Sequence, residues 1–171
     1  MRTPRSLVTV SMVSALISIL SFEPAYARGQ TESACRATPF VNQQKDEATI
    51  RRLETSWNVA ITRGEAALED CLLTADFLEI LSNGDLKTRT DELGFTAKNK
   101  GQNKPLPRLP AFTVVIHGNV AMAFATWTPL ATNRLPEKTV DYFIWENDSW
   151  HVFFSQSTPI EQKISLRWRH L

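Results

Sequence analysis

The residue whose type and setting could do chemistry is Asp141, which opens the aromatic stretch DYFIWENDSWHVFFSQS. A strand made mainly of aromatic and β-branched residues is expected to be buried, and an unpaired carboxylate is costly to bury. Asp141 must therefore be hydrogen-bonded, hydrated or protonated. Because burial raises the pKa of a carboxyl group, it fits such a group for proton transfer at neutral pH. We take Asp141 as the candidate catalytic residue.

The stretch around Asp141 predicts a β-hairpin with Asn147-Asp148 as its two-residue turn. This turn would pair residue 145 with 150, residue 143 with 152 and residue 141 with 154. Side chains alternate along a strand, so one face carries Asp141, Phe143, Trp145, Trp150, Val152 and Phe154, and the other carries Tyr142, Ile144, Glu146, Ser149, His151 and Phe153. The first face is almost wholly apolar, so we expect it to face a pocket. The residues of this hairpin predicted to line the pocket are Phe143, Val152 and Phe154.

Two roles are open for Asp141. As a structural group it would accept a hydrogen bond from the indole N–H of Trp57 or from a neighbouring Thr or Arg. As a functional group it would face a ligand. The same alternatives apply to Trp57 and Trp127, because a tryptophan fills a core as readily as it stacks on a ligand. Both are kept as pocket-lining candidates.

Motifs for metals and cofactors do not occur in the sequence. The three histidines, His117, His151 and His170, lack the spacing of metal ligands. No phosphate-binding glycine loop and no Ser-His-Asp arrangement is present. The sequence therefore predicts neither a metal nor a cofactor.

Helical periodicity precedes strand periodicity along the chain. Segment 46–65 predicts a helix that Gly64 ends. Its apolar face carries Ile50, Leu53, Trp57, Ala60 and Ile61, and its polar face carries Arg51, Arg52, Glu54 and Asn58. Shorter helices are expected at 65–73 and 91–100. Two short strands are expected within 77–88, on either side of an Asn83-Gly84 turn, and longer strands at 111–117, 120–130, 138–146 and 149–157. This order predicts an α+β domain with helices on one face of a curved sheet.

The N-terminus predicts export. A basic start is followed by an apolar run from Leu7 to Leu20 and by Ala25-Tyr26-Ala27, a small-x-small cleavage site. The run is shorter than the ~20 residues of a membrane-spanning helix, and an uncleaved anchor is the alternative. We expect a signal peptide at 1–27 cut after Ala27, an irregular arm at 28–45, one domain at 46–160 and a tail at 161–171. The mature chain would be periplasmic and without membrane attachment.

Charge and cysteine content narrow the class of protein further. Loss of Arg2, Arg5 and Glu23 with the signal peptide would change the formal net charge from +1 to zero. A neutral chain without basic clusters has no electrostatic footprint for nucleic acid. Cys35 and Cys71 remain in the mature chain, and an oxidising compartment favours a disulfide between them.

Several short motifs over residues 46–160 resemble, in their order and spacing, the nuclear transport factor 2-like superfamily. They are Trp57-Asn58 with Ala60 and Gly64, Asp76-Phe77, Gly84 before KTRTDEL, Gly118-Asn119-Val120-Ala121, and TVDYFIWENDSWHVFFSQST. More narrowly, the chain looks like the branch catalogued as domain of unknown function 4440, related to SnoaL-like polyketide cyclases and to ketosteroid isomerase. The resemblance implies a curved antiparallel sheet that forms a cone-like half barrel, with two to three N-terminal helices on its concave face over an apolar cavity.

Function in this superfamily ranges over isomerases, dehydratases, cyclases, binding domains and assembly modules, so the fold alone assigns no chemistry. Our leading prediction is an exported domain that binds a small apolar molecule. An alternative is a homodimeric interaction module, because paired sheets are the common dimer form in this superfamily. The surface for it would be the second hairpin face, with Tyr142, Ile144 and Phe153.

The other alternative is a small isomerase, dehydratase or cyclase that uses Asp141. In steroid isomerases a strand at a similar place carries an acid that donates a hydrogen bond to the substrate. The catalytic base of those enzymes would fall near Leu81, whose side chain cannot accept a proton. Glu79 and Asp85 lie close by in the sequence, and either side chain could point inward or outward. A second titratable group facing Asp141 across the cavity would distinguish an enzyme from a binding domain.

Overall fold

The structure is a computed structural model that describes residues 35–36, 40–106, 108–128 and 135–161. The helices and strands in these ranges are α2 (Glu47–Arg63), α3 (Ala66–Leu72), β1 (Leu73–Ile80), β2 (Leu86–Thr88), α4 (Arg89–Ala97), β3 (Thr113–His117), β4 (Val120–Trp127), β5 (Glu137–Glu146) and β6 (Ser149–Pro159). The predicted signal peptide (1–27), most of the arm (28–45) and nearly all of the tail (161–171) lie outside the described residues.

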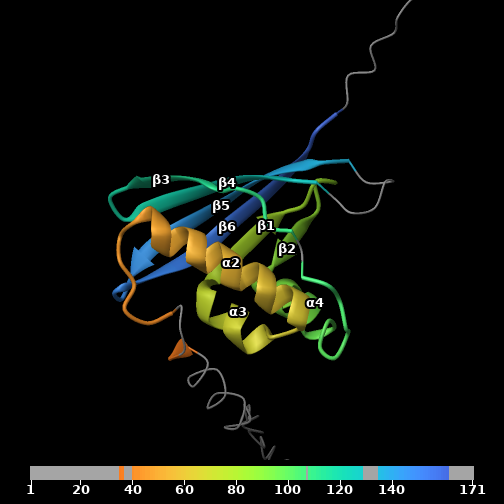
Figure 1. Ribbon diagram of the computed structural model, residues 1–171, viewed down its shortest axis with the longest axis horizontal. Helices are drawn as coiled ribbons and strands as arrows, with labels where there is room; N and C mark the ends of the chain where they lie inside the picture. The colour runs from red at the N-terminus through yellow and green to blue at the C-terminus, as the bar shows by residue number, and fades with distance from the viewer. Residues whose placement is uncertain (1–34, 37–39, 107, 129–134, 162–171) are drawn as a thin grey trace, which may run out of the picture.

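The strands form one curved sheet in the order β2-β1-β6-β5-β4-β3. Figure 1 shows α2, α3 and α4 together on one face of this sheet, with α2 running across it. The predicted α+β class, with three helices against one face, is confirmed. We call the face toward the helices the inner face and the opposite one the outer face.

One strand pairing differs from the predicted antiparallel sheet. β1 and β6 run parallel, whereas the other neighbouring strands run antiparallel. Parallel neighbours need a long connection, and residues 81–148 provide it between β1 and β6. The difference arises because this pairing joins two strands far apart in the sequence.

Helix α2 has clear boundaries in the sequence. The Asp46 side chain accepts a hydrogen bond from the backbone N–H of Thr49 at 2.7 Å, which caps the first turn. Gly64 ends the helix with a φ of 75°, a conformation that favours glycine. A Cβ at Gly64 would lie 2.1 Å from the backbone nitrogen of Lys100. The end of α2 is therefore packed directly against the chain that follows α4.

The core lies between α2 and the inner face of the sheet. Its apolar members include Ile50, Leu53, Trp57, Leu72, Phe77, Ala121, Ala123, Phe143, Trp150 and Val152. Three small alanines on β4 let the helix approach the sheet closely. Side chains therefore fill most of the space between α2 and the inner face. The space that remains lies beside the first half of β5 and the second half of β6.

The β5–β6 hairpin carries a β-bulge that changes the predicted register. Its turn is as predicted, with positive φ at Asn147 (50°) and Asp148 (59°). Phe153 is an extra residue, so Asp141 pairs with Ser155 and not with residue 154. The bulge moves Phe154 to the outer face beside Tyr142, with 5.7 Å between the ring centroids. The prediction that Phe154 shares a face with Asp141 is therefore wrong, and Ser155 takes that place.

The described part of the N-terminal arm is tied to the domain. The predicted disulfide between Cys35 and Cys71 is present. The side chain of Gln43 accepts a hydrogen bond from the backbone N–H of Trp150 at 2.7 Å, and the backbone carbonyl of Gln44 accepts one from its indole N–H at 3.0 Å. No helix in the described ranges is long and apolar enough to cross a membrane.

Candidate functional site

Asp141 lies on the inner face of β5 and is 6% exposed. In the sheet it stands between Ala123 of β4 and Ser155 of β6. The hydroxyl of Ser155 donates a hydrogen bond to Asp141 Oδ1 at 2.5 Å. The indole N–H of Trp57 binds Glu69, so Ser155 takes the structural role that the sequence left open for Trp57, a Thr or an Arg.

Glu54 of α2 meets Asp141 from the opposite side. It is 1% exposed, and the two carboxyl groups share a hydrogen bond. Burial first, and then the charge of Asp141, raise the pKa of Glu54 well above its usual range. Burial raises the pKa of Asp141 to about 6, against the lowering effect of the hydrogen bonds from Ser155 and Glu54. The pair therefore keeps a shared proton into the neutral range.

A second carboxyl pair lies beside the first. Trp57 donates its indole N–H to Glu69 Oε1 at 2.7 Å, and Glu69 in turn shares a hydrogen bond with Glu92 of α4. Burial, aided by the charge of Glu92, raises the pKa of Glu69 to about 8. Both pairs join a helix to a neighbouring element through a carboxyl group that keeps its proton at neutral pH.

Lys87 of β2 is the cation that contacts these buried carboxyl groups. Its ammonium nitrogen lies 3.5 Å from Glu79 Oε2 and also contacts Glu92. Burial and the charge of Glu92 raise the pKa of Glu79 to about 7, although Lys87 lowers it. Paired residues in the register place Asp141, Ser155, Glu79 and Lys87 in one row across four strands. Glu79 therefore faces inward.

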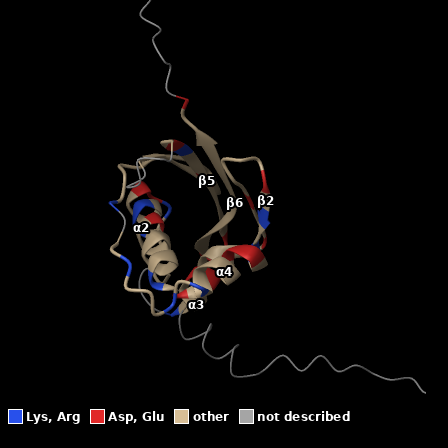
Figure 2. Cartoon of the chain, turned by 90° about the vertical axis from the view of Figure 1, so that its right-hand side faces the viewer, with Lys and Arg blue, Asp and Glu red and all other residues tan. Residues whose placement is uncertain are grey.

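These side chains surround a cavity of about 110 Å³. Its lining residues are Glu54, Trp57, Asn58, Ile61, Glu79, Glu92, Trp127, Thr139, Asp141, Ser155 and Ser157. A wider hollow of about 930 Å³ shares part of this wall and continues outward between β1, β2 and α4. Figure 2 views the molecule from this side, with the helices opposite the curved sheet and acidic residues marked in red on α4.

The predicted pocket residues fall into three groups. Trp57, Trp127 and Asp141 line the cavity together. Phe143 and Val152 are fully buried one row further along the strands, in the core and not in the cavity wall. Phe154 lies on the outer face. The wall is also more polar than the apolar pocket that we expected.

Glu54 was assigned to the polar face of its helix, and this assignment is wrong. It follows Ile50 by four residues and precedes Trp57 by three, which puts it on the buried stripe of an α-helix. The helical spacing was a signal that could have found it. Glu69 and Glu92 carry no comparable local signal, because their partners lie on other elements.

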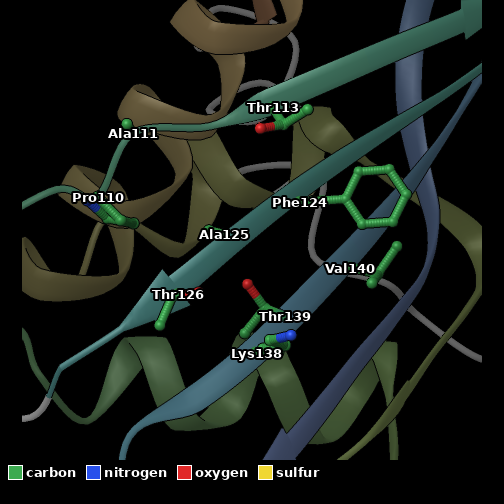
Figure 3. A pocket seen from close by; sticks show the side chains of 9 residues that line it. All are labelled: Pro110, Ala111, Thr113, Phe124, Ala125, Thr126, Lys138, Thr139 and Val140. Atoms are coloured by element: carbon green, nitrogen blue, oxygen red, sulfur yellow. The ribbon is translucent and has the colours of Figure 1, made fainter.

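A second, open groove of about 460 Å³ runs along β4 and β5. Figure 3 shows Phe124, Val140 and Lys138 on this surface, with Pro110 and Ala111 on the segment that leads into β3. It shares Thr139 with the inner cavity and contains no carboxyl group. We therefore place the candidate site at the inner cavity. Within the described ranges, no group of three His, Cys, Asp or Glu side chains is arranged to hold a metal ion.

Neither a protein-family model nor a curated protein matches the sequence. Solved structures do match. A nuclear transport factor 2-like protein from Cytophaga hutchinsonii superposes with a TM-score of 0.55 at 16% identity, over 67% of this chain and 98% of that one. The chain has the nuclear transport factor 2-like fold.

Two further structures with the nuclear transport factor 2-like fold agree. A protein of unknown function from Silicibacter pomeroyi has a TM-score of 0.55 at 15% identity, over 66% of this chain and 94% of that chain. A protein from Novosphingobium aromaticivorans, described as having a cystatin-like fold, has a TM-score of 0.53 at 16% identity, over 71% of this chain and 86% of that one. Identities this low establish the fold and no activity, and the narrower branch, domain of unknown function 4440, stays a prediction.

Proposed function

We propose that the protein is a small-molecule-binding domain whose ligand enters the hollow between α4 and the sheet and contacts the Glu54–Asp141 pair. The single observation that supports this most is the orientation of the pair. Both carboxyl groups line a cavity that shares part of its wall with a wider hollow. Side chains this costly to bury are common where a protein binds or reacts with a ligand.

A variant that fills the cavity tests the proposal. Ser157 lines both the cavity and the hollow, and Thr158 follows it on the exposed side of β6. A mixture of small organic fragments would be screened by ligand-observed NMR. We expect some fragments to bind the wild type and Thr158→Phe, and the same fragments to fail to bind Ser157→Phe. Fragments that bind Ser157→Phe as well as the wild type would contradict the proposed site.

An enzyme is the second candidate, and one observation favours it. Glu54 supplies the second titratable group facing Asp141 that a binding domain would not need. Two carboxyl groups whose environments separate their pKa values form an acid and base pair. Ionised Asp141 would accept a proton from a substrate carbon or hydroxyl, and protonated Glu54 would donate one, as an isomerase, dehydratase or cyclase requires.

Deuterium exchange tests the enzymatic candidate without knowledge of the substrate. Acetophenone, a small enolisable ketone, would be incubated with the protein in heavy water and followed by NMR. If the cavity contains a general base, deuterium should enter the methyl group of acetophenone faster with the wild type than in buffer alone. Asp141→Asn should lose this acceleration. Incorporation at the buffer rate would count against proton abstraction from a ketone of this size.

We also propose that the domain forms homodimers through the outer face of the sheet. Exposed apolar side chains on this face are Leu78, Val115, Val120 and Phe124, and half-buried ones are Tyr142, Ile144, Phe153 and Phe154. A continuous apolar patch is unusual on a monomer. A second copy presenting the same patch would cover it by two-fold symmetry.

Export to the periplasm is proposed on the N-terminal sequence and supported by the disulfide. Disulfides persist in oxidising compartments, and Cys35–Cys71 is formed in the structure. Mass spectrometry of the exported protein should find Arg28 as the first residue. An exported form that keeps Met1 would contradict cleavage after Ala27.

A further inference from the structure

The charges around the cavity are unbalanced. The charged groups that face it or contact its wall are Glu54 on α2, Glu69 on α3, Glu79 on β1, Lys87 on β2, Glu92 on α4 and Asp141 on β5. Lys87 is engaged by Glu79 and Glu92, and its ammonium group lies 4.4 Å from the centroid of the Phe95 ring. No basic side chain of the described residues lines the inner cavity. The Glu54–Asp141 pair is thus left without a cation.

One buried atom of this pair lacks a donor. Glu54 Oε1 is inaccessible to solvent and receives no hydrogen bond from the described residues. Buried oxygens without a partner are few in folded proteins, and each calls for an explanation. Because Glu54 lines the cavity, a ligand that displaces the proton shared with Asp141 would donate an N–H to this carboxyl group.

The aromatic part of the wall fits the same type of ligand. Trp57 donates its indole N–H to Glu69, and Trp127 donates its own to Thr139 Oγ1 at 3.1 Å. With both N–H groups engaged inside the protein, each tryptophan can offer a ligand only its ring. Aromatic rings attract organic cations and apolar groups, and they do not favour anions.

We propose that the ligand is a small organic cation: an ammonium group attached to an apolar body. The ammonium would donate hydrogen bonds to Glu54 and Asp141, and the apolar body would lie beside Ile61 and Trp127, toward the wider hollow. The cavity, at about 110 Å³, exceeds the roughly 10–15 Å³ that one water needs. This inference rests on the proposed binding function and names the class of its ligand.

Binding of such a cation would draw the proton from Glu54. A positive charge beside a carboxyl group favours its ionised form, so the ligand and the shared proton compete for the same pair. Affinity for the cation should therefore rise with pH through the range in which Asp141, Glu79 and Glu69 lose their protons. A neutral ligand of the same shape should show no such rise.

Three probes of similar shape separate the outcomes in isothermal titration calorimetry at pH 7.5: benzylammonium, benzyl alcohol and benzoate. We expect the wild type to bind benzylammonium at least about ten-fold more tightly than benzyl alcohol, because charge-assisted hydrogen bonds are the stronger ones. Benzoate should not bind. Affinity for benzylammonium should also rise several-fold between pH 5.5 and 8.

Two glutamine variants of α2 provide the matched comparison. Glu54→Gln should lose the preference for benzylammonium and keep its affinity for benzyl alcohol. Glu47→Gln removes the same charge from the exposed start of the same helix, where Glu47 pairs with Arg51, and should bind as the wild type does. Thermal unfolding shows whether each variant is folded before it is titrated.

The outcomes distinguish this inference from the proposed function. If benzyl alcohol binds as tightly as benzylammonium, the ligand class is wrong and the binding pocket stands. If benzylammonium binds equally to the wild type and to Glu54→Gln, the cation site does not include this pair and the inference is overturned. If none of the three probes binds at millimolar concentration, the inference and the proposed pocket both fail.

Discussion

Glu54 on helix α2 and Asp141 on strand β5 share a hydrogen bond inside the protein, although 87 positions separate them in the sequence. Carboxyl groups attract each other only when one of them keeps its proton. Burial and the charge of Asp141 raise the pKa of Glu54, so a proton remains between them at neutral pH. The contact between the main helix and the sheet therefore depends on protonation.

The stability of the fold should decrease as pH rises. The pKa values of Asp141, Glu79 and Glu69, about 6, 7 and 8, lie above the ordinary values of 3.8 and 4.5. A raised pKa means that the folded state binds more protons than the unfolded one, so the stabilisation is complete below pH 4 and is lost through pH 5 to 8. The midpoint of thermal unfolding should fall by several degrees between pH 5 and 8.5. A midpoint that is constant or rises over this range would contradict the raised pKa values.

Replacement of Asp141 by Asn should leave the protein as stable as the wild type, or more stable, at pH 7.5. The amide removes a buried charge, its oxygen can still accept from Ser155, and its nitrogen can donate to Glu54. Ser155→Ala, which removes a donor and keeps the charge, should be less stable than the wild type by about 1 kcal/mol. Chemical unfolding measures both differences.

A contrary result for Asp141→Asn has a definite meaning. A loss of about 1–3 kcal/mol would match the disruption of a buried hydrogen bond. If ligand binding were unchanged as well, Asp141 would be a structural group and would have no role in the candidate site.

Gly64 should tolerate no side chain. Its φ is 75°, and a Cβ there would lie 2.1 Å from the backbone nitrogen of Lys100. Gly84 has a φ of 88° and no atom within 4 Å of the same position. Gly64→Ala should therefore destabilise the fold by clearly more than Gly84→Ala, whose cost is backbone strain of about 1 kcal/mol. Equal losses in thermal unfolding would show that the contact with Lys100 does not matter.

The proposed dimer can be tested at its exposed residues. Val115 and Phe124 are 45% and 36% exposed on the outer face, so changing them disturbs the core little. The double variant Val115→Glu/Phe124→Glu should be monomeric by light scattering, because burying two carboxylates in the interface is costly. Leu106→Glu, on an exposed loop, should stay dimeric. A wild type that is monomeric at high concentration would end the proposal.

Local patterns predicted the local features of this fold. Asn147-Asp148 indicated the hairpin turn, Gly64 the end of α2, and two cysteines in a chain predicted to be exported the disulfide. Each depends on a few neighbouring residues or on the compartment. The inward orientation of Asp141 likewise followed from the apolar residues alternating with it.

Features set by distant contacts were missed. The bulge at Phe153 adds no recognisable residue to the sequence, yet it exchanges Phe154 for Ser155 at the site. The parallel pairing of β1 with β6 depends on where the chain returns. The buried or half-buried carboxyl groups come one from each of five elements, so no spacing in the sequence indicates that they meet; they are Glu54, Glu69, Glu79, Glu92 and Asp141. The buried position of Glu54 could be predicted from its helical spacing to Ile50 and Trp57. It was missed because a charged side chain was expected to face solvent.

The most direct test of the account is the titration of Glu54 and Asp141 by carbon-13 NMR of their side-chain carboxyl groups. We predict that Asp141 titrates near pH 6 and Glu54 at a higher pH. In Asp141→Asn, the pKa of Glu54 should fall, because the charge that raises it is gone. Two carboxyl groups that both titrate near pH 4 in the wild type, without any effect of Asp141→Asn on Glu54, would contradict the buried pair and the site built on it.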